Sequence, residues 1–315
     1  MWRYVVMRVG QLIVTLFIAS VVVFLVIEHA PGNPVLVQLG LNPTHAEIVN
    51  ETRKLGLNDP LPQRYAIWIS QAVRLNLGKS FSTGLPVTQT ITQAFGNTFR
   101  LTVMAVLLGF LLGAPLGVLA ALRRGGKLDA AISSFAALGL SVPNFAVGTL
   151  LILVFSVHFK LMPSAGGGIP GQSFVSALKF TLMPAITLAI PFAAVFVRYV
   201  RMELGEGMSQ PYILTARSLG LRPVTVVYNG WRNAMIPTLT VMGIQIGRLL
   251  AGAVVTETVF SYPGLGYLTI QSIQSLDYPV VEGVLLVAAA VFLLVMFVVD
   301  LLVGLADPRV RLGSR

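Results

Sequence analysis

The sequence predicts an all-α, polytopic membrane protein, and its composition and its apolar runs both indicate this class. Hydrophobic residues make up 55% of the 315 residues and charged residues only 11%, with a mean hydropathy of +0.81. A soluble domain carries about 25% charged residues. A helix needs about 20 apolar residues to cross the hydrocarbon core, and we assign six such spans. They are residues 9–27, 101–122, 131–157, 181–197, 234–256 and 281–306.

The first apolar run follows Arg3 and Arg8, as in a secretory signal peptide. Its apolar stretch is long, however, and the following "VIEHAPGNP" has no small-x-small cleavage site. We therefore expect residues 1–28 to form an uncleaved N-terminal transmembrane helix.

The positions of the basic residues predict that both termini are cytoplasmic. Lys and Arg of short loops favour the cytoplasmic side, and the rule weakens for loops beyond roughly 60 residues. With the N-terminus inside, the short outer loops carry only Lys160 and Lys179, whereas the inner segments are rich in arginine. We expect six transmembrane helices in an N-in, C-in arrangement.

Two connections are longer than a link between helices requires. The outer one, residues 29–100, contains "QRYAIWISQAVRL", which is typical of an amphipathic helix, and we expect an extracellular subdomain there. Residues 101–306 would form the remaining five-helix core, with an inner loop at residues 198–233. An inner loop of this length suggests a cytoplasmic partner. Residues 307–315 are expected to be a cytoplasmic tail.

The inner loop contains a short basic segment, "PYILTARSLGLRP", with a proline at each end. On a helix, Tyr212, Ala216 and Gly220 would fall at i, i+4 and i+8, on one stripe. An aromatic anchor followed by two very small residues would let the helix lie deep in a partner's groove. The same stripe fits packing on the protein's own helices equally well, and Arg217 would then be an ordinary positive-inside residue.

Glycines and prolines inside the spans have structural and functional interpretations. Gly109, Gly113 and Gly117 repeat at four-residue spacing, which allows close helix packing, either within the chain or against a second subunit. Prolines free backbone carbonyls that protein or water must satisfy. Ser141, Pro143 and Asn144 form the best candidate for a bend that lines a translocation path.

Several stretches resemble one family. "YILTARSLGLRPVTVVYNGWRNAMIPTLTVMG" resembles the cytoplasmic loop of the permease subunits of dipeptide and oligopeptide ATP-binding-cassette importers, specifically the B-type subunit. "PGNPV", "LNLGKS", "LSVPNFAVGTLLILVFSVHFKLMPSAGGG", "GAVVTETVFSYPGLGYL" and "DPRVRL" resemble the family at their proper places, so the similarity covers nearly the whole chain. Where importer permeases in general have Glu-Ala-Ala before the loop glycine, this chain has Leu214, Thr215 and Ala216, as peptide permeases commonly diverge there.

The resemblance implies a type I importer permease fold, with a large extracellular loop between the first two helices, in a bacterial plasma membrane. It implies a second homologous permease of the C type, two ATPase subunits and an external solute-binding protein that delivers peptide. ATP hydrolysis would belong to the partner subunits, so the chain itself would be no enzyme and would need no cofactor. The residues that couple to the ATPase would be Tyr212, Ala216, Arg217 and Gly220.

The outer end of the last two spans has its own candidate residues. Glu257 and Asp277 flank a segment that contains no lysine or arginine. An acidic outer mouth would attract the amino terminus of a peptide or a basic patch of the binding protein. Both carboxylates could equally be ordinary solvated loop charges.

The alternative function is an ion-coupled secondary transporter or channel that works without an ATPase. Such proteins usually need ionisable groups inside the membrane. Arg248 and Asp300 are the candidates here, and either could be a structural charge paired with a neighbour. The scattered histidines and the lack of cysteine give no metal or catalytic motif, and the basic charge fits a membrane better than nucleic acid. The resemblance to peptide permeases leaves dipeptides, longer peptides, glutathione and nickel chelates open as substrates.

Overall fold

The computed structural model describes residues 2–31, 34–39, 43–54, 56–167 and 174–306. Within these residues the chain is helical and has no β-strand, apart from one isolated antiparallel bridge between Lys79 and Pro86. The all-α class is therefore confirmed. The predicted tail, residues 307–315, lies outside the described residues, as does its "DPRVRL" motif.

Among the described residues, six helical segments that could cross a membrane correspond to the six predicted spans when one bent pair of helices is counted as one segment. Five are single helices that are long and apolar enough to cross a membrane, and the sixth is a pair of helices joined at a bend. The single helices are α1 (Trp2–Glu28), α5 (Val87–Leu122), α8 (Phe174–Gly207), α10 (Pro223–Ala251) and α13 (Tyr278–Ala306). The bent pair comprises α6 (Lys127–Ser141) and α7 (Asn144–Leu151), and α7 continues as the π-helix η1 (Ile152–His158).

The fifth span ends earlier than its hydropathy predicts. Helix α10 stops at Ala251, and Gly252 has a φ of +128°. Two short helices follow, α11 (Val254–Val259) and α12 (Leu265–Gln274). The prediction of one continuous span over residues 234–256 is therefore wrong, because the apolar pattern continues past a backbone break that only glycine adopts easily.

Helices α5 and α8 form the most extensive helix contact of the structure. Gly109, Gly113 and Gly117 are buried on the face of α5 that meets α8. A Cβ atom added at these glycines would lie within 2.9 Å of the side chains that fill the space, which are those of Phe192, Phe196 and Val200. The glycine repeat therefore packs within this chain, since the second helix that approaches it is α8.

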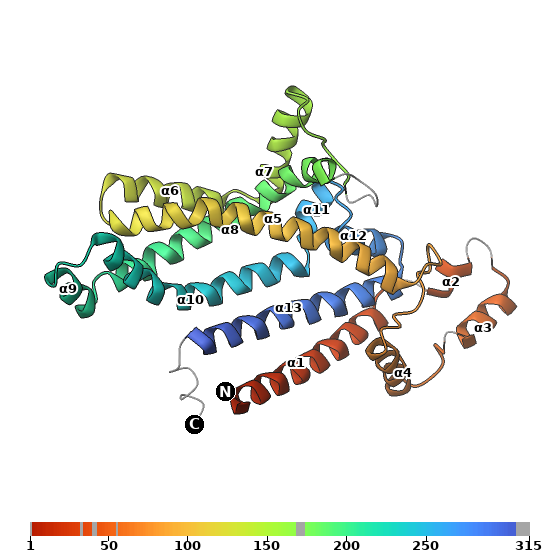
Figure 1. The fold of residues 1–315 in the computed structure, drawn as a ribbon. Coiled ribbons are helices and arrows are strands. Elements are labelled where there is room, and N and C mark those ends of the chain that lie inside the picture. The colour runs from red at the N-terminus through yellow and green to blue at the C-terminus, as the bar shows by residue number, and fades with distance from the viewer. Residues whose placement is uncertain (1, 32–33, 40–42, 55, 168–173, 307–315) are drawn as a thin grey trace.

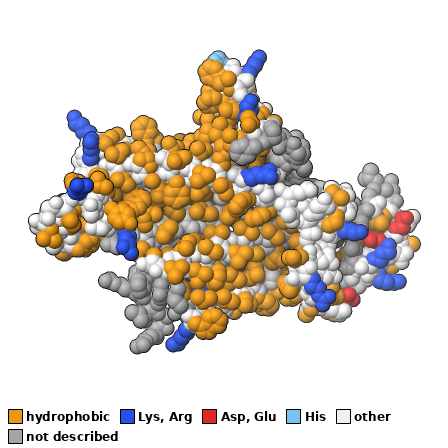
Figure 2. All heavy atoms as spheres, viewed as in Figure 1, with side chains coloured by type: hydrophobic (Ala, Val, Ile, Leu, Met, Phe, Trp, Pro, Cys, Tyr) orange, Lys and Arg blue, Asp and Glu red, His pale blue; other side chains and the backbone are white. Residues whose placement is uncertain are grey.

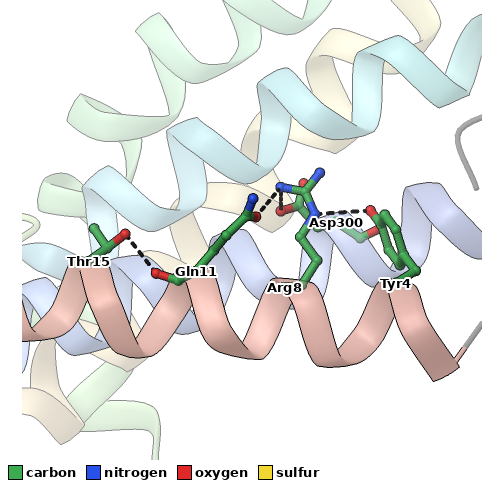
Figure 3. A network of polar contacts seen from close by, with 5 residues as sticks. All are labelled: Tyr4, Arg8, Gln11, Thr15 and Asp300. Atoms are coloured by element: carbon green, nitrogen blue, oxygen red, sulfur yellow. Dashed lines mark hydrogen bonds and ion pairs between the residues drawn. The ribbon is translucent and has the colours of Figure 1, made fainter. Parts of the chain in front are cut away.

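Helix α1 lies beside α13 and is joined to it by a polar cluster (Figure 3). Arg8 Nη1 lies 2.9 Å from Asp300 Oδ2, and the Tyr4 hydroxyl donates to the backbone oxygen of Asp300 over 3.1 Å. Gln11 accepts a hydrogen bond from Arg8 over 3.3 Å. Asp300 is thus a structural charge that pairs with a neighbouring helix, which was one of the two interpretations of this residue.

The long connections lie at opposite ends of the helix bundle (Figure 1). Helix α9 (Pro211–Ser218) lies at the end of the bundle where α1 starts and α13 ends. Helices α2 (Pro34–Leu39), α3 (His45–Lys54) and α4 (Leu61–Val73) lie at the other end. Between the ends, hydrophobic side chains cover most of the face seen in Figure 2, and lysines and arginines lie around its margins.

The predicted amphipathic helix of the first loop is α4, and it packs on α1. The Tyr65 hydroxyl lies 2.8 Å from Ser20 Oγ, and Phe24 lies edge-on to the Tyr65 ring at 5.4 Å. Arg64 forms an ion pair with Glu28 at the outer end of α1. These contacts hold α4 against α1 of the membrane bundle.

The arrangement of the two ends yields a topology prediction. Because the sequence contains no cysteine, single introduced cysteines can be labelled without background. Thr83 and Ser209 are exposed and belong to opposite ends of the bundle. A cysteine placed at Thr83 should react with a membrane-impermeant thiol reagent in intact cells, whereas a cysteine at Ser209 should react only after the cells are opened. The reverse labelling pattern would contradict the N-in, C-in orientation.

Candidate functional site

Helix α9 is shorter than the predicted stripe requires. It begins with Pro211 in its first turn, where the missing N–H costs nothing. It ends because Gly220 has a φ of +70° and donates its N–H to Arg217 O over 3.0 Å, while Leu221 N donates to Ala216 O. This is the glycine-type helix end. The prediction of one helical stripe through Tyr212, Ala216 and Gly220 is therefore wrong at Gly220, which terminates the helix.

The small residue on α9 faces the protein and not the surroundings. Ala216 and Ile213 are buried against Val226 of α10, with Met208 packed beside them. This is the second interpretation of the stripe, in which it packs on the protein's own helices. Tyr212 and Arg217, by contrast, are exposed. A contact of any of these residues with an ATPase stays a prediction.

Large apolar side chains surround the end of α9 and are exposed at this end of the bundle. Leu219 is 75% exposed and Val224 is 79% exposed, and Leu214 and Tyr228 are exposed as well. We call these four residues the tip surface. None of these four residues is among the site residues predicted from the sequence. The leucines on either side of Gly220 in "SLGLRP" could have indicated an apolar surface there.

A buried ion pair fixes the neighbouring turn between α5 and α6. The buried carboxylate of Asp129 accepts hydrogen bonds from Arg201 Nε and, over 2.8 Å, from Arg201 Nη2. It also accepts from Gly125 N over 2.9 Å. A bidentate pair of this kind requires that the guanidinium and the carboxylate lie in one specific geometry. It ties the α5–α6 turn to α8, the helix that leads into α9.

The predicted bend of the third span is present. Helix α6 ends at Ser141, α7 begins at Asn144, and the two helices differ in direction by 95°. Pro143 lacks the N–H that would continue α6, so the chain turns there. Ser141 Oγ donates to Ala137 O over 2.8 Å, and Pro143 is exposed. That these residues line a translocation path stays a prediction.

The two outer carboxylates are buried, contrary to both interpretations. Glu257 is 0% exposed and accepts hydrogen bonds from Thr98 Oγ1 over 2.8 Å and from Tyr267 N over 3.0 Å. Thr98 Oγ1 in turn accepts from Leu265 N. Glu257 therefore holds the α11–α12 turn onto α5.

Asp277 has the corresponding role at the start of α13. It is 1% exposed, and it accepts hydrogen bonds from the backbone N–H of Phe81 over 3.0 Å and from Ser82 Oγ over 2.7 Å. Ser80 Oγ also donates to it. The predicted exposed acidic mouth is therefore wrong as far as these two residues are concerned, since neither displays its charge on the surface of the chain.

Arg248, the other deep charge, stands apart from these satisfied groups. It is exposed on α10, its hydrogen-bond partner is Gln245 Oε1 at 3.5 Å, and it forms no ion pair among the described residues. An arginine at the centre of a membrane helix costs about 2.5–3.5 kcal/mol on insertion scales. Such a residue must therefore face water, a partner protein or a ligand.

Comparison with known proteins identifies the chain. Residues 113–312 match the model of the family described as "Binding-protein-dependent transport system inner membrane component", and residues 1–102 match its N-terminal counterpart. The chain belongs to this family. It is therefore a multi-pass component of the bacterial inner membrane, as its apolar helices also indicate.

Curated relatives extend over the whole chain. The probable peptide ABC transporter permease protein y4tP of Sinorhizobium fredii is 35% identical, over 98% of this chain and 99% of its own. The di/tripeptide transport system permease protein DppB of Pseudomonas aeruginosa is 38% identical, over 99% of each chain. The glutathione transport system permease protein GsiC of Escherichia coli is 37% identical, also over 99% of each.

A solved structure supports the fold. A chain of the inward-facing MetNI methionine ABC transporter matches with a TM-score of 0.58 at 21% identity, covering 70% of this chain and 97% of that chain. The helical core therefore shares its fold with a chain of an ABC transporter. At this identity the match concerns the fold alone.

The Glu257 hydrogen bonds lead to a stability prediction. Glu257→Gln replaces one acceptor oxygen by a donor that meets N–H and O–H groups, and a buried polar group left unpaired costs about 1–3 kcal/mol. We expect a lower melting temperature of the purified protein and faster proteolysis at the α11–α12 turn. Equal melting temperatures for variant and wild type would contradict the structural role of the carboxylate.

Proposed function

We propose that this permease is the B-type transmembrane subunit of an ATP-driven peptide importer, and that it forms the translocation path together with a second, homologous permease. The observation that carries the proposal is the full-length similarity, at 35–38% identity, to permeases named for peptide, di/tripeptide and glutathione transport. The family description adds a binding protein as a partner. Two ATPase subunits would supply the energy, so the permease itself hydrolyses nothing.

The tip surface is the proposed docking site for the ATPase. It lies at the end of the bundle where the chain begins and α13 ends, opposite the first-loop helices (Figure 1). Burying a leucine or valine side chain contributes about 1.5–3 kcal/mol. Four exposed apolar side chains around one short helix are therefore a strong basis for association in water, and the neighbouring Arg217 and Tyr212 would flank the contact.

A displacement of α9 has a physical route into the membrane core. Helix α9 is covalently joined to α8 and α10, and Ile213 and Ala216 pack on the first turns of α10. Helix α8 is packed along α5 through the glycine repeat and is tied to the α5–α6 turn by Asp129 and Arg201. Since packed helices move as rigid elements, a movement of the ATPase would shift α8 and α10 relative to the outer end.

ATP dependence tests this proposal against the ion-coupled alternative. In membrane vesicles that contain the permease with its partner subunits, uptake of a labelled di- or tripeptide should require ATP. Collapse of the proton gradient with ATP maintained should leave the initial rate unchanged. Uptake that stops with the gradient while ATP is present would instead establish the ion-coupled function.

Substitutions at the tip surface test the docking site. Val224→Asp and Leu219→Asp should each weaken ATPase binding about tenfold or more, since the lost burial exceeds about 1.4 kcal/mol. The matched control is Val73→Asp, which changes a valine of similar exposure, 77%, at the opposite end of the bundle. We expect the control to keep the ATPase through purification and to transport normally. If Val224→Asp does the same, the ATPase docks elsewhere.

Gly220 calls for a different substitution from the one that its sequence context suggests. A Cβ at this position meets no other atom within 4 Å, so valine there would act through backbone strain at φ +70°. Asparagine tolerates this conformation, whereas a β-branched residue does not. Gly220→Asn should therefore preserve coupling better than Gly220→Val, and the difference in ATPase retention measures how far docking depends on this helix end.

A further inference from the structure

Arg248 lies at the middle of the bundle although it occupies the last turn of its helix. The neighbouring Gly247 faces Phe292, and a Cβ at Gly247 would lie 2.9 Å from that ring. Phe292 is the central residue of the 29-residue helix α13. Leu249, on the other side, packs into the cluster around Leu101 and Ala105, in the middle part of α5. Helix α10 therefore ends at about half the depth that α5 and α13 span.

The backbone is also broken at this depth. After Ala251 the chain leaves the helix at Gly252, and α11 starts only at Val254 (Figure 1). Non-helical backbone at membrane depth is tolerated only where protein covers it or where it lines a water-filled cavity. The break and the charged side chain are two independent features of the same level of the structure.

The exposed side of α10 carries polar residues where a lipid-facing helix would be apolar. Thr240 and Arg248 are exposed, two turns apart on one face, and Gln245 lies beside Arg248. At the same level, the exposed residue of α5 is Leu107, next to Leu108 of the cluster that contains Leu249. This contrast indicates that the polar face of α10 borders water, and the apolar face of α5 borders lipid.

We propose that Arg248, together with the α10–α11 break, forms a binding site for the carboxylate of the transported molecule inside the translocation path. The inference rests on the proposed function and adds the chemical group of the substrate that this subunit recognises. A guanidinium offers a planar fork of donors that matches a carboxylate, and it stays protonated at any working pH. Every peptide with a free C-terminus carries this group.

The surroundings of Arg248 fit a site that binds a substrate briefly during transport better than a site that holds a ligand permanently. Gln245 Oε1 is a neutral partner at 3.5 Å, and two carboxylates of the bundle, Asp300 and Asp129, are paired with Arg8 and Arg201 instead of with Arg248. The last carbonyls of α10 place negative partial charge next to the guanidinium. A carboxylate would therefore be attracted by one charge only, so it can also leave.

The first experiment compares substrates with and without the carboxylate. In vesicles with the complete complex, ATP-dependent uptake of dialanine and trialanine is measured beside uptake of their C-terminal amides. We expect Arg248→Gln to lower the ratio of acid to amide uptake at least tenfold, and Arg248→Lys to lower it less. Arg74→Gln, which removes an exposed arginine of the outer loop, should leave the ratio unchanged.

The second experiment tests whether the site is accessible to water, and it does not depend on a transport measurement. A cysteine at Gln245 keeps Arg248 in place, and it should react with a water-soluble, charged methanethiosulfonate reagent in the assembled complex. A cysteine at Leu107, at the same depth on α5, should not react. Saturating trialanine should slow the reaction at position 245.

The outcomes separate the site from the function. If wild-type complex transports the peptides with ATP and Arg248→Gln leaves the acid-to-amide ratio unchanged, the carboxylate site is overturned while the proposed function stands. An unreactive cysteine at position 245 also overturns it, because Arg248 then faces a covering surface such as an acidic group of the second permease. Wild-type uptake that ignores ATP overturns the importer function itself, although reactivity and peptide protection at position 245 would still support the site.

Discussion

The close approach of α5 and α8 is the contact on which the rest of the structure depends. Gly109, Gly113 and Gly117 have no side chain that would hold the two helices apart, and the rings of Phe192 and Phe196 fill the space. Because membrane helices associate through packing and not through a hydrophobic drive from water, small residues at the contact decide which helices pair. Both inner connections then start from this pair, since α5 leads into the α5–α6 turn and α8 leads into α9.

Buried carboxylates fasten the ends of the spans. Glu257 holds the α11–α12 turn to Thr98 of α5, and Asp277 holds the first-loop serines to the start of α13. Asp129 does the same at the inner end with Arg201. A buried carboxylate is stable only when donors surround it, and these three have such donors. Their charges join segments that are distant in the sequence, which leaves Arg248 as a charge with a different use.

In the proposed mechanism, a single helix, α10, connects the tip surface to the level of Arg248. The tip surface belongs to the segment between α8 and α10, and α10 stops halfway across the bundle, beside Arg248. A movement at the tip surface is therefore transmitted by one helix directly to the level where a substrate carboxylate would bind. The family membership supports an ATPase partner, and the packing shows how an ATPase docked at the proposed site would act on the path.

The sequence by itself determined the class, the approximate positions of the apolar spans, the bend at Pro143 and the family, because hydropathy, proline and short motifs act locally or along the chain. The tertiary structure decided the rest. Thr98 and Glu257 are 159 positions apart, and Ser80 and Asp277 are 197 apart, so no local pattern reveals that these carboxylates are buried. Likewise, Ala216 faces inward only because Val226 lies opposite, and Gly220 ends α9 through a backbone angle that spacing does not show. The sequence marks Arg248 as a charge within an apolar run, but only the packing of Gly247 on Phe292 places the end of α10 at mid-depth. Side-chain direction and depth depend on contacts between distant segments, and these exist only once the helices have packed.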